Sequence, residues 1–206
     1  MLDAEGIPPR NEPRRFNNKI LKNGVQNSSK KKCYICGMEM RRATEADIQK
    51  IMVIMDSARA FQRSLGFNQW EDGYPDTDVI KHDISTRDAY VFCDDRTIVG
   101  YAFLPVGDDS YDWLTGVWKY PGEYGVIHRL AISPTMRGQG LSAKIFSLIE
   151  TNFMGRGIKI IRVDTGTENT IMQRIMASNN YECRGTRNFS WGERLAYEKL
   201  LPAQSK

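Results

Sequence analysis

Residues 128–142 read HRLAISPTMRGQGLS, which is an apolar strand, a turn that contains proline, and a glycine-rich start of a helix. Beyond this stretch the apolar residues recur at helical spacing. The first N–H groups of a helix have no partner within it, and the helix dipole favours an anion at this end. Gly138 and Gly140 allow a ligand to approach this backbone closely. The stretch therefore predicts a phosphate-binding turn between Arg137 and Ser142.

The spacing of this turn narrows the kind of phosphate. It fits neither the Walker pattern nor the dinucleotide pattern G-x-G-x-x-G. Arg137-x-x-Gly140-x-Ser142 resembles the loop that binds the acyl-CoA pyrophosphate in the GNAT superfamily of N-acetyltransferases, whose pattern is Gln/Arg-x-x-Gly-x-Gly/Ala. Ser142 departs from that pattern but is small and adds a hydroxyl donor. The alternative interpretation is a turn rich in arginine and glycine that only begins a helix.

The composition is that of a soluble globular protein, with 206 residues, 41% of them hydrophobic and 26% charged. No apolar stretch approaches the ~20 residues that span a bilayer, and the N-terminus has no apolar signal core. We therefore expect a cytoplasmic protein without a membrane partner.

The positive charge lies in residues 1–37, which carry +5, whereas the rest of the chain carries −1. This segment has few large apolar residues, so we expect a basic, disordered tail followed by one domain over residues 38–206. Its Lys30-Lys31-Lys32 run could bind nucleic acid, but such runs are more often solvated. We do not expect nucleic acid to be a partner, and we expect a monomer or a homodimer.

The cysteines and histidines do not predict a metal site. Cys33 and Cys36 form a lone C-x-x-C pair, without the second pair or the nearby histidines of a zinc site. The histidines, His82 and His128, are far away in other predicted elements. We therefore expect no metal ion.

The hydrophobic periodicity predicts a mixed α/β (α+β) fold in the order β-α-α-β-β-β-α-β-α-β-β. Strands are expected at residues 38–42, 89–93, 98–105, 124–132, 158–164, 181–187 and 194–200, and helices at 44–63, 77–86, 140–153 and 170–178. This order is similar to that of the GNAT acyl-CoA N-acyltransferase fold. The resemblance implies a seven-stranded mixed sheet, with strands 4 and 5 splayed apart, and about four helices.

The segment that ends the fifth strand extends the resemblance. Residues 161–174 read IRVDTGTENTIMQR and are similar to a bacterial branch of GNAT enzymes in which an Arg-x-Asp-Thr run precedes an Asn and a Met-Gln-Arg helix. The resemblance implies that acetyl-CoA is a co-substrate, with its pantetheine between the splayed strands. It assigns cofactor binding to Leu130, Ala131, Ile132, Arg137, Gly138, Gln139, Gly140, Leu141, Ser142 and Asn169. Asn169 could instead serve only as a helix N-cap.

The expected general acid is missing from the sequence. Many family members carry a tyrosine seven residues after this asparagine, where this chain has Met176. A methionine cannot donate a proton, so we considered Tyr181 or Tyr197 as replacements, although both could be core residues.

Two residues are candidate bases for removing a proton from an amine. His128 lies on the fourth strand, where alternation would put it on one face with Leu130 and Ile132. Asp164 ends the fifth strand and could accept the proton or bind a cationic substrate. The alternatives are a buried histidine and a turn-forming aspartate.

The resemblance to the GNAT fold implies that two loops, which carry aromatic and acidic residues, flank the acceptor. Gln69, Trp70 and Tyr74 are the candidate substrate-binding residues of the first loop, and residues 111–120 form the second. Aromatic and acidic side chains suit a cationic amine, but they could also pack over the edge of the sheet.

The sequence thus predicts an acetyl-CoA-dependent N-acetyltransferase, in which a primary amine of a small molecule or a protein attacks the thioester directly. The alternative is a non-catalytic acyl-CoA-binding sensor on the same fold, which the missing tyrosine keeps open. The acceptor and the preferred acyl length are not determined by the sequence.

Overall fold

The computed structural model of the protein describes residues 37–67, 69–70, 73–112, 118–189 and 192–202. The predicted tail, apart from Gly37, lies outside these residues, and so do residues 71–72 and 113–117, which belong to the two acceptor loops. The elements are β1 (Glu39–Arg42), α1 (Ile48–Ser64), α2 (Thr77–Ser85), β2 (Ala89–Asp94), β3 (Thr97–Phe103), α3 (Asp109–Asp112), β4 (Tyr124–Val126), β5 (His128–Ile132), α4 (Ser142–Gly155), β6 (Ile160–Gly166), α5 (Thr170–Ser178), β7 (Glu182–Phe189) and β8 (Gly192–Leu200).

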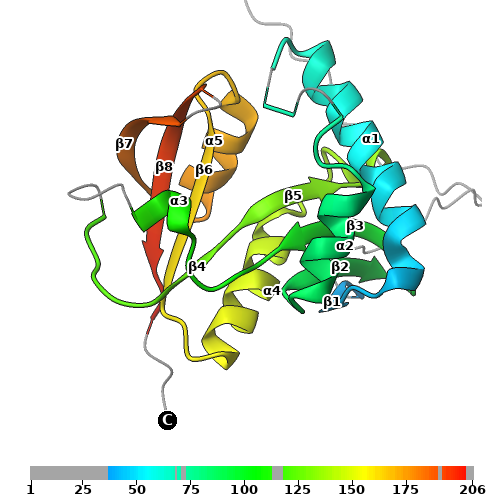
Figure 1. Cartoon of the computed structure of the whole chain (residues 1–206), viewed down its shortest axis with the longest axis horizontal. Helices are drawn as coiled ribbons and strands as arrows, with labels where there is room; N and C mark the ends of the chain where they lie inside the picture. Colours follow the sequence, from blue (N-terminus) through cyan, green and yellow to red (C-terminus); the bar gives the residue numbers. More distant parts are fainter. Residues whose placement is uncertain (1–36, 68, 71–72, 113–117, 190–191, 203–206) are drawn as a thin grey trace, which may run out of the picture. The chain divides into compact units, whose positions relative to one another are not determined.

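The described strands form two four-stranded sheets rather than one seven-stranded sheet. The first has the order β1-β2-β3-β5 and the second the order β4-β6-β8-β7. Neighbouring strands are antiparallel except for β4 and β6, which are parallel. The predicted mixed α/β class is confirmed, and the two sheets diverge where β5 leaves β4 and β6 (Figure 1).

The single strand predicted over residues 124–132 is in fact two strands that belong to different sheets. Val126 still pairs with Arg162 of β6, and the Ile127 N–H donates to the Arg162 carbonyl at 3.1 Å. The next residue, His128, already pairs with Phe103 of β3. The chain therefore passes from one sheet to the other at Ile127, which leaves β5 and β4 as the end strands that border the gap.

Helix α4 packs beneath both sheets and holds them together. Its buried residues Ile145, Phe146, Ile149 and Phe153 share one hydrophobic cluster with β2 and β3 of the first sheet and with β6 and β8 of the second. Gly125 of β4 lies so close to the Phe153 ring that a β-carbon there would collide with it. Helices α1 and α2 cover the other face of the first sheet, in a second cluster (Figure 1).

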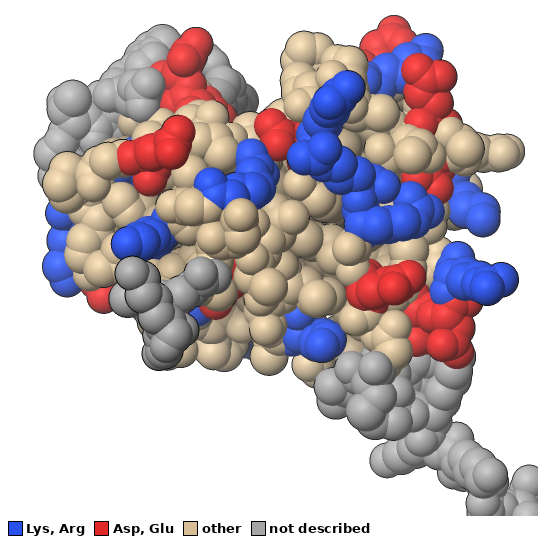
Figure 2. Space-filling model, turned by 90° about the horizontal axis from the view of Figure 1, so that it is seen from below, with Lys and Arg blue, Asp and Glu red and all other residues tan. Residues whose placement is uncertain are grey.

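Charged side chains of both signs are interspersed on the surface. Figure 2 shows basic and acidic groups side by side across one face of the molecule. This distribution agrees with the charge of about zero that the sequence gives the chain after its tail.

Candidate active site

Strand β5 contains a bulge that places Arg129 in a strained conformation. Tyr101 pairs with Ala131 and Phe103 pairs with His128, so two residues along β3 correspond to three along β5. Arg129 has a φ of 51°, in the left-handed region that a residue with a side chain rarely adopts. Such strain is often found at functional sites.

The bulge changes which side chains share a face of the strand. His128 lies on the side of Phe103, with which its ring stacks at a centroid distance of 6.2 Å. Leu130 and Ile132 instead pack against the cluster formed around α4. The prediction that His128, Leu130 and Ile132 share one face is therefore wrong, because an inserted residue reverses the alternation.

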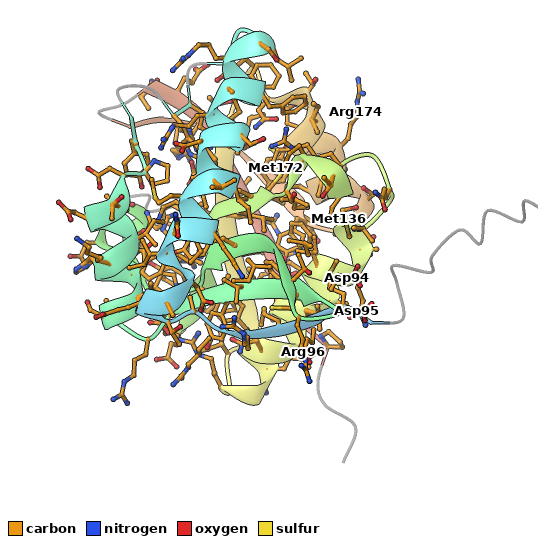
Figure 3. The ribbon with its side chains drawn as sticks, turned by 90° about the vertical axis from the view of Figure 1, so that its right-hand side faces the viewer. Asp94, Asp95, Arg96, Met136, Met172 and Arg174 are labelled. Carbon is orange, nitrogen blue, oxygen red and sulfur yellow. The ribbon has the colours of Figure 1, made fainter. Side chains whose placement is uncertain are left out.

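An apolar cavity of about 470 Å³ lies along β5 and is also lined by residues of α1, α4 and α5. All but one of the predicted cofactor-binding residues line it, namely Leu130, Ala131, Ile132, Arg137, Gly138, Gly140, Leu141, Ser142 and Asn169; Gln139 does not. Met136 and Met172 reach the cavity from the turn after β5 and from α5 (Figure 3). The cavity thus brings together segments that surround the gap between the sheets.

The turn before α4 forms part of the wall of the apolar cavity. Gly138 and Gly140 have φ values of 72° and 71°, and a β-carbon on either would meet open space. In the part of the chain that the structure describes, the N–H groups of Gly138, Gln139 and Gly140 donate to no other protein group. Glycine is therefore needed here for the backbone conformation, and the free donors suit an anion.

The side chain of Arg137 turns away from this backbone and toward α1. Its guanidinium lies over the Phe61 ring at 4.7 Å and donates to the Ser57 hydroxyl and the Ile132 carbonyl, both at 3.3 Å. Burial lowers its pKa below the usual value. Arg137 therefore links the turn to α1 while its positive charge remains at the cavity wall.

Asn169 serves as a cap and also links the two sides of the site. Its carbonyl oxygen accepts a hydrogen bond from the Met172 N–H at 3.0 Å, which makes it the N-cap of α5. Its amide nitrogen donates to the Gln69 side chain at 3.3 Å. The predicted N-cap is thus confirmed, and Asn169 also lines the apolar cavity.

A second, polar cavity of about 820 Å³ adjoins the first. It is lined by the candidate bases His128 and Asp164, by the candidate acceptor residues Gln69, Trp70 and Tyr74, and by His82, Asp83, Phe103, Asp108, Ser110, Ile127, Arg129 and Arg194. Trp70 lines both cavities. The structure therefore brings together the residues predicted separately for the base and for the acceptor site.

His128 is paired with a carboxylate in the polar cavity. Its Nε2 lies 2.5 Å from Oδ2 of Asp108, and both side chains are about four-fifths buried. The other Asp108 oxygen accepts hydrogen bonds from the Ser110 N–H at 2.7 Å and from its hydroxyl at 2.5 Å. Burial alone would raise the pKa of Asp108, but the hydrogen bonds from His128 and Ser110 lower it overall. Asp108 is therefore an ionised partner that orients the imidazole.

Asp164 is held by a donor on each of its oxygens. The Tyr111 hydroxyl donates to Oδ1 and Nε of Arg194 donates to Oδ2. Burial and the adjacent Asp164 charge raise the pKa of Tyr111 well above its usual value, so the phenol remains a donor. The Tyr111 ring also lies against His128, at a centroid distance of 5.9 Å. Asp164 is thus better placed to position its neighbours than to accept a proton.

Arg129 is anchored by a fully buried carboxylate. Its Nε and Nη2 donate to the two oxygens of Asp83 at 2.8 and 2.6 Å, and its Nη1 donates to the Tyr74 hydroxyl at 2.7 Å. Asp83 also accepts from the Tyr101 hydroxyl at 2.7 Å. These bonds explain how the bulge at Arg129 is held in place.

Of the described aromatic residues of the second loop, Trp118 and Tyr120 pack over the second sheet rather than around the acceptor. The guanidinium of Arg162 lies over the rings of Trp118 and Tyr124, at 4.4 and 3.8 Å, and its Nε donates to the buried Glu198 at 3.2 Å. Trp118 and Tyr120 also pack against the buried cluster formed by Tyr111, Tyr124, Val126 and Ile160. For these residues, the structure supports the alternative of aromatic packing.

The tyrosines considered as replacement acids lie in the core. Tyr181 and Tyr197 are 4% and 6% exposed, and Met176 is fully buried in the same cluster. All three are absent from the linings of the two cavities. The Tyr181 hydroxyl has no hydrogen-bond partner among the described residues, and burial followed by the nearby Glu150 charge raises its pKa well above the usual value. Tyr181 is therefore poorly placed to protonate a leaving group.

Four charged side chains of the site were not singled out from the sequence. Arg129 and Arg194 looked like ordinary strand residues, and Asp108 was one of several loop acids. Asp83 did leave a signal, because it follows Ile80 by three residues on the buried face of α2. A carboxylate on the buried face of an amphipathic helix predicts a buried ionic partner.

The comparisons with known proteins agree with this geometry. The sequence model of the Acetyltransferase (GNAT) family matches residues 50–180. The chain belongs to the GNAT acetyltransferase family. It is a GNAT-type N-acetyltransferase, and the predicted superfamily and fold are confirmed.

Solved structures of this family are similar over most of the chain. A GNAT acetyltransferase from Streptococcus agalactiae is 33% identical, with a TM-score of 0.73 over 82% of this chain and 98% of its own. One from Listeria monocytogenes is 21% identical, with a TM-score of 0.64 over 80% and 95%. A Salmonella typhimurium protein solved with acetyl-CoA is 16% identical, with a TM-score of 0.58 over 82% and 97%.

No curated protein has a significant sequence match to the chain. Among the helices of the described residues, none combines the length and the hydrophobicity that crossing a bilayer requires.

Proposed function

We propose that this GNAT acetyltransferase transfers an acetyl group from acetyl-CoA to a primary amine, which attacks the thioester directly. The observation that carries the proposal is the junction of the two cavities at Trp70, with the His128–Asp108 pair on the polar side. An apolar cavity with free backbone donors in its wall suits a long cofactor with a phosphate group. A polar cavity with a base suits an amine that must lose a proton.

The apolar cavity fits acetyl-CoA in two respects. The donors of residues 138–140 are free in the described structure and suit the pyrophosphate. Among the described strands β5 pairs with β3 alone, and its other edge, beside Leu130 and Ile132, suits the amides of the pantetheine, as another strand would. When bound, acetyl-CoA supplies the activated thioester.

His128 is the general base in this proposal. An alkyl amine has a pKa near ~10.4 and is mostly protonated at neutral pH, so its proton must be removed before it reacts. The Asp108 carboxylate holds the imidazole at 2.5 Å and stabilises its positive charge after it takes up the proton. Asp164 keeps Tyr111 and Arg194 in position beside this pair.

In this proposal, no residue of the apolar cavity protonates the leaving group, which departs as a thiolate. Apart from Arg137, the residues that line this cavity in the described structure carry no titratable side chain. A thiol has a pKa near ~8.5, so a thiolate is a good leaving group near neutral pH. Proximity of the two reactants in the joined cavities supplies much of the rate.

The test is release of the free thiol from acetyl-CoA in the presence of a panel of primary amines. We expect turnover with at least one amine, and we expect His128→Gln to lower kcat while calorimetry shows unchanged acetyl-CoA affinity. His82→Gln is the matched control, because His82 lines the same cavity outside the pair. Tight binding of CoA without turnover of any amine would favour a sensor instead.

A further inference from the structure

We propose that the acceptor is a small amine that also carries a carboxylate, as an amino acid does, and that Arg194 binds this carboxylate. The inference rests on the proposed function and assigns its substrate class. Arg194 extends from β8 into the wall of the polar cavity, and its side chain is 10% exposed. It lies on the same wall as Asp164, whose oxygen accepts its Nε–H.

The terminal nitrogens of Arg194 are the feature that calls for a ligand. Neither Nη1 nor Nη2 donates to any group in the described parts of the chain, and both are accessible rather than sealed in the core. A guanidinium presents its donors as a planar fork that matches the two oxygens of a carboxylate. A nine-tenths buried arginine with this fork open to a cavity is therefore a built anion site.

The orientation of this fork is fixed by its neighbours. Nε of Arg194 is held by Asp164, and the second oxygen of Asp164 is held by the Tyr111 hydroxyl. Tyr111 is itself 1% exposed. Because these side chains are already ordered, a carboxylate can bind Arg194 with little further loss of conformational entropy.

The other arginine of the cavity differs in this respect. In Arg129, Nε and Nη2 already donate to Asp83 and Nη1 donates to Tyr74, and the guanidinium lies over the Phe103 ring at 4.6 Å. Arg129 therefore serves the bulge in β5. Of the two arginines that line the polar cavity, Arg194 is the one with donors to spare for a substrate.

The arrangement places the anion site close to the base. The Tyr111 ring lies against the His128 ring, at 5.9 Å between centroids, while its hydroxyl reaches the partner of Arg194. One tyrosine side chain thus spans the two ends, so one small molecule can bring its amine to His128 and its anion to Arg194. The cavity also contains Asp83, Asp108 and Asp164, whose charges repel an anion. A single guanidinium therefore suits a carboxylate, with one negative charge, better than it suits a phosphate dianion.

The experiment compares amino acids with their carboxamides as acceptors in the thiol-release assay. For the preferred side chain, we expect kcat/KM for the acid to exceed that for the amide at least tenfold. Arg194→Gln should remove this preference, because it should raise KM for the acid much more than KM for the amide, so that the two kcat/KM values become about equal. Arg194→Lys should restore part of the preference, because it keeps the charge without the fork.

Arg187→Gln is the matched control. Arg187 is the cross-strand partner of Arg194 in the β7–β8 hairpin and lies outside both cavity linings, so its loss removes the same charge from the same hairpin. It should leave the preference for the acid unchanged. Thermal unfolding of each variant verifies that the hairpin is folded.

Calorimetry with the acid and the amide, in the absence of acetyl-CoA, gives a second readout. Binding of the acid that is at least tenfold tighter, and that Arg194→Gln abolishes, would support the inference even if no acetylation were found and the proposed function failed. Equal use and equal binding of acid and amide would overturn it while leaving the acetyltransferase activity intact. Preference for an aminoalkyl phosphate over every amino acid would also overturn it.

Discussion

The two cavities of this enzyme are built in opposite ways. The apolar cavity is lined largely by neighbouring stretches of chain, from Leu130 to Phe146 and from Asn169 to Ile175. The polar cavity draws on residues from Gln69 to Arg194 and is held by ion pairs across long sequence distances, such as Asp83 with Arg129 and Asp164 with Arg194.

This difference has a functional meaning within the proposed mechanism. Backbone donors and apolar side chains would recognise acetyl-CoA, which is the same in every reaction. The positions of these groups depend on local backbone conformation. Ion pairs and single hydrogen bonds recognise the acceptor, and each can change without disturbing the other cavity. We therefore expect substitutions in one cavity to leave the binding function of the other intact.

Replacement of His128 should have the largest effect on turnover. His128→Gln removes the base, so we expect kcat to fall about 10²- to 10⁴-fold, the usual range for loss of general base catalysis. The acetyl-CoA affinity measured by calorimetry should not change, because His128 is outside the lining of the apolar cavity. A parallel loss of acetyl-CoA affinity would mean that the two cavities are not separate in function.

Replacement of Gly140 should affect the opposite cavity. Gly140→Trp forces a large side chain into a left-handed backbone position beside the free donors, so we expect acetyl-CoA affinity to fall about a hundredfold, about 2.7 kcal/mol. Gly157→Trp is the control, because Gly157 has a similar φ of 83° just after the other end of α4 and also faces open space. Equal acetyl-CoA affinity of the two variants would contradict the phosphate site.

Replacement of Asp108 should have a smaller effect on turnover. Asp108→Asn removes the carboxylate that orients the imidazole, so we expect kcat to fall about tenfold. An unchanged kcat would show that Asp108 does not act through His128.

The stability of the same variant provides a pH test. The hydrogen bonds lower the pKa of Asp108 in the folded protein, so its ionised form stabilises the fold above the unfolded pKa of ~3.9, and this contribution is lost as the pH falls through the lower folded value. Asp108→Asn should therefore lower the free energy of unfolding by about 1.5–3 kcal/mol at pH 7. In urea titrations, the difference from the native protein should shrink toward pH 3 and should not grow.

Replacement of Tyr74 should weaken the binding of the acceptor but not that of acetyl-CoA. Tyr74→Phe removes the hydroxyl that accepts a hydrogen bond from Arg129 at 2.7 Å, so we expect the acceptor KM to rise about 2- to 10-fold with unchanged acetyl-CoA affinity.

Replacement of Trp70 should affect both substrates. Trp70→Ala should weaken the binding of the acceptor and of acetyl-CoA, because Trp70 lines both cavities. This expectation replaces the simpler one from sequence, in which Trp70 belongs to the acceptor side alone.

Replacement of Tyr181 should leave activity unchanged. Tyr181→Phe removes a hydroxyl that is buried in the core without a partner in the described structure, so kcat should stay the same and the fold should be equally or more stable. Steady-state kinetics and thermal unfolding measure both. A large loss of kcat with intact folding would identify Tyr181 as the acid after all.

The same contrast explains how far the sequence alone could lead. The turn at Gly138 and Gly140 and the N-cap at Asn169 follow from local backbone rules, so these parts of the apolar cavity's wall were predictable from the sequence. The bulge at Arg129 was not, because it depends on how β5 pairs with β3, and so the face of His128 was predicted wrongly. The partners of His128 and Asp164 come from distant segments that only the tertiary fold brings together.

A crystal structure of the protein with bound CoA would test whether the two cavities meet at the reaction centre. We predict that the pyrophosphate lies on the backbone donors of residues 137–142, that the pantetheine follows β5, and that the sulfur lies beside Trp70 and faces His128. A sulfur atom that points away from His128, or a CoA molecule in the polar cavity, would contradict the proposed division between cofactor and acceptor.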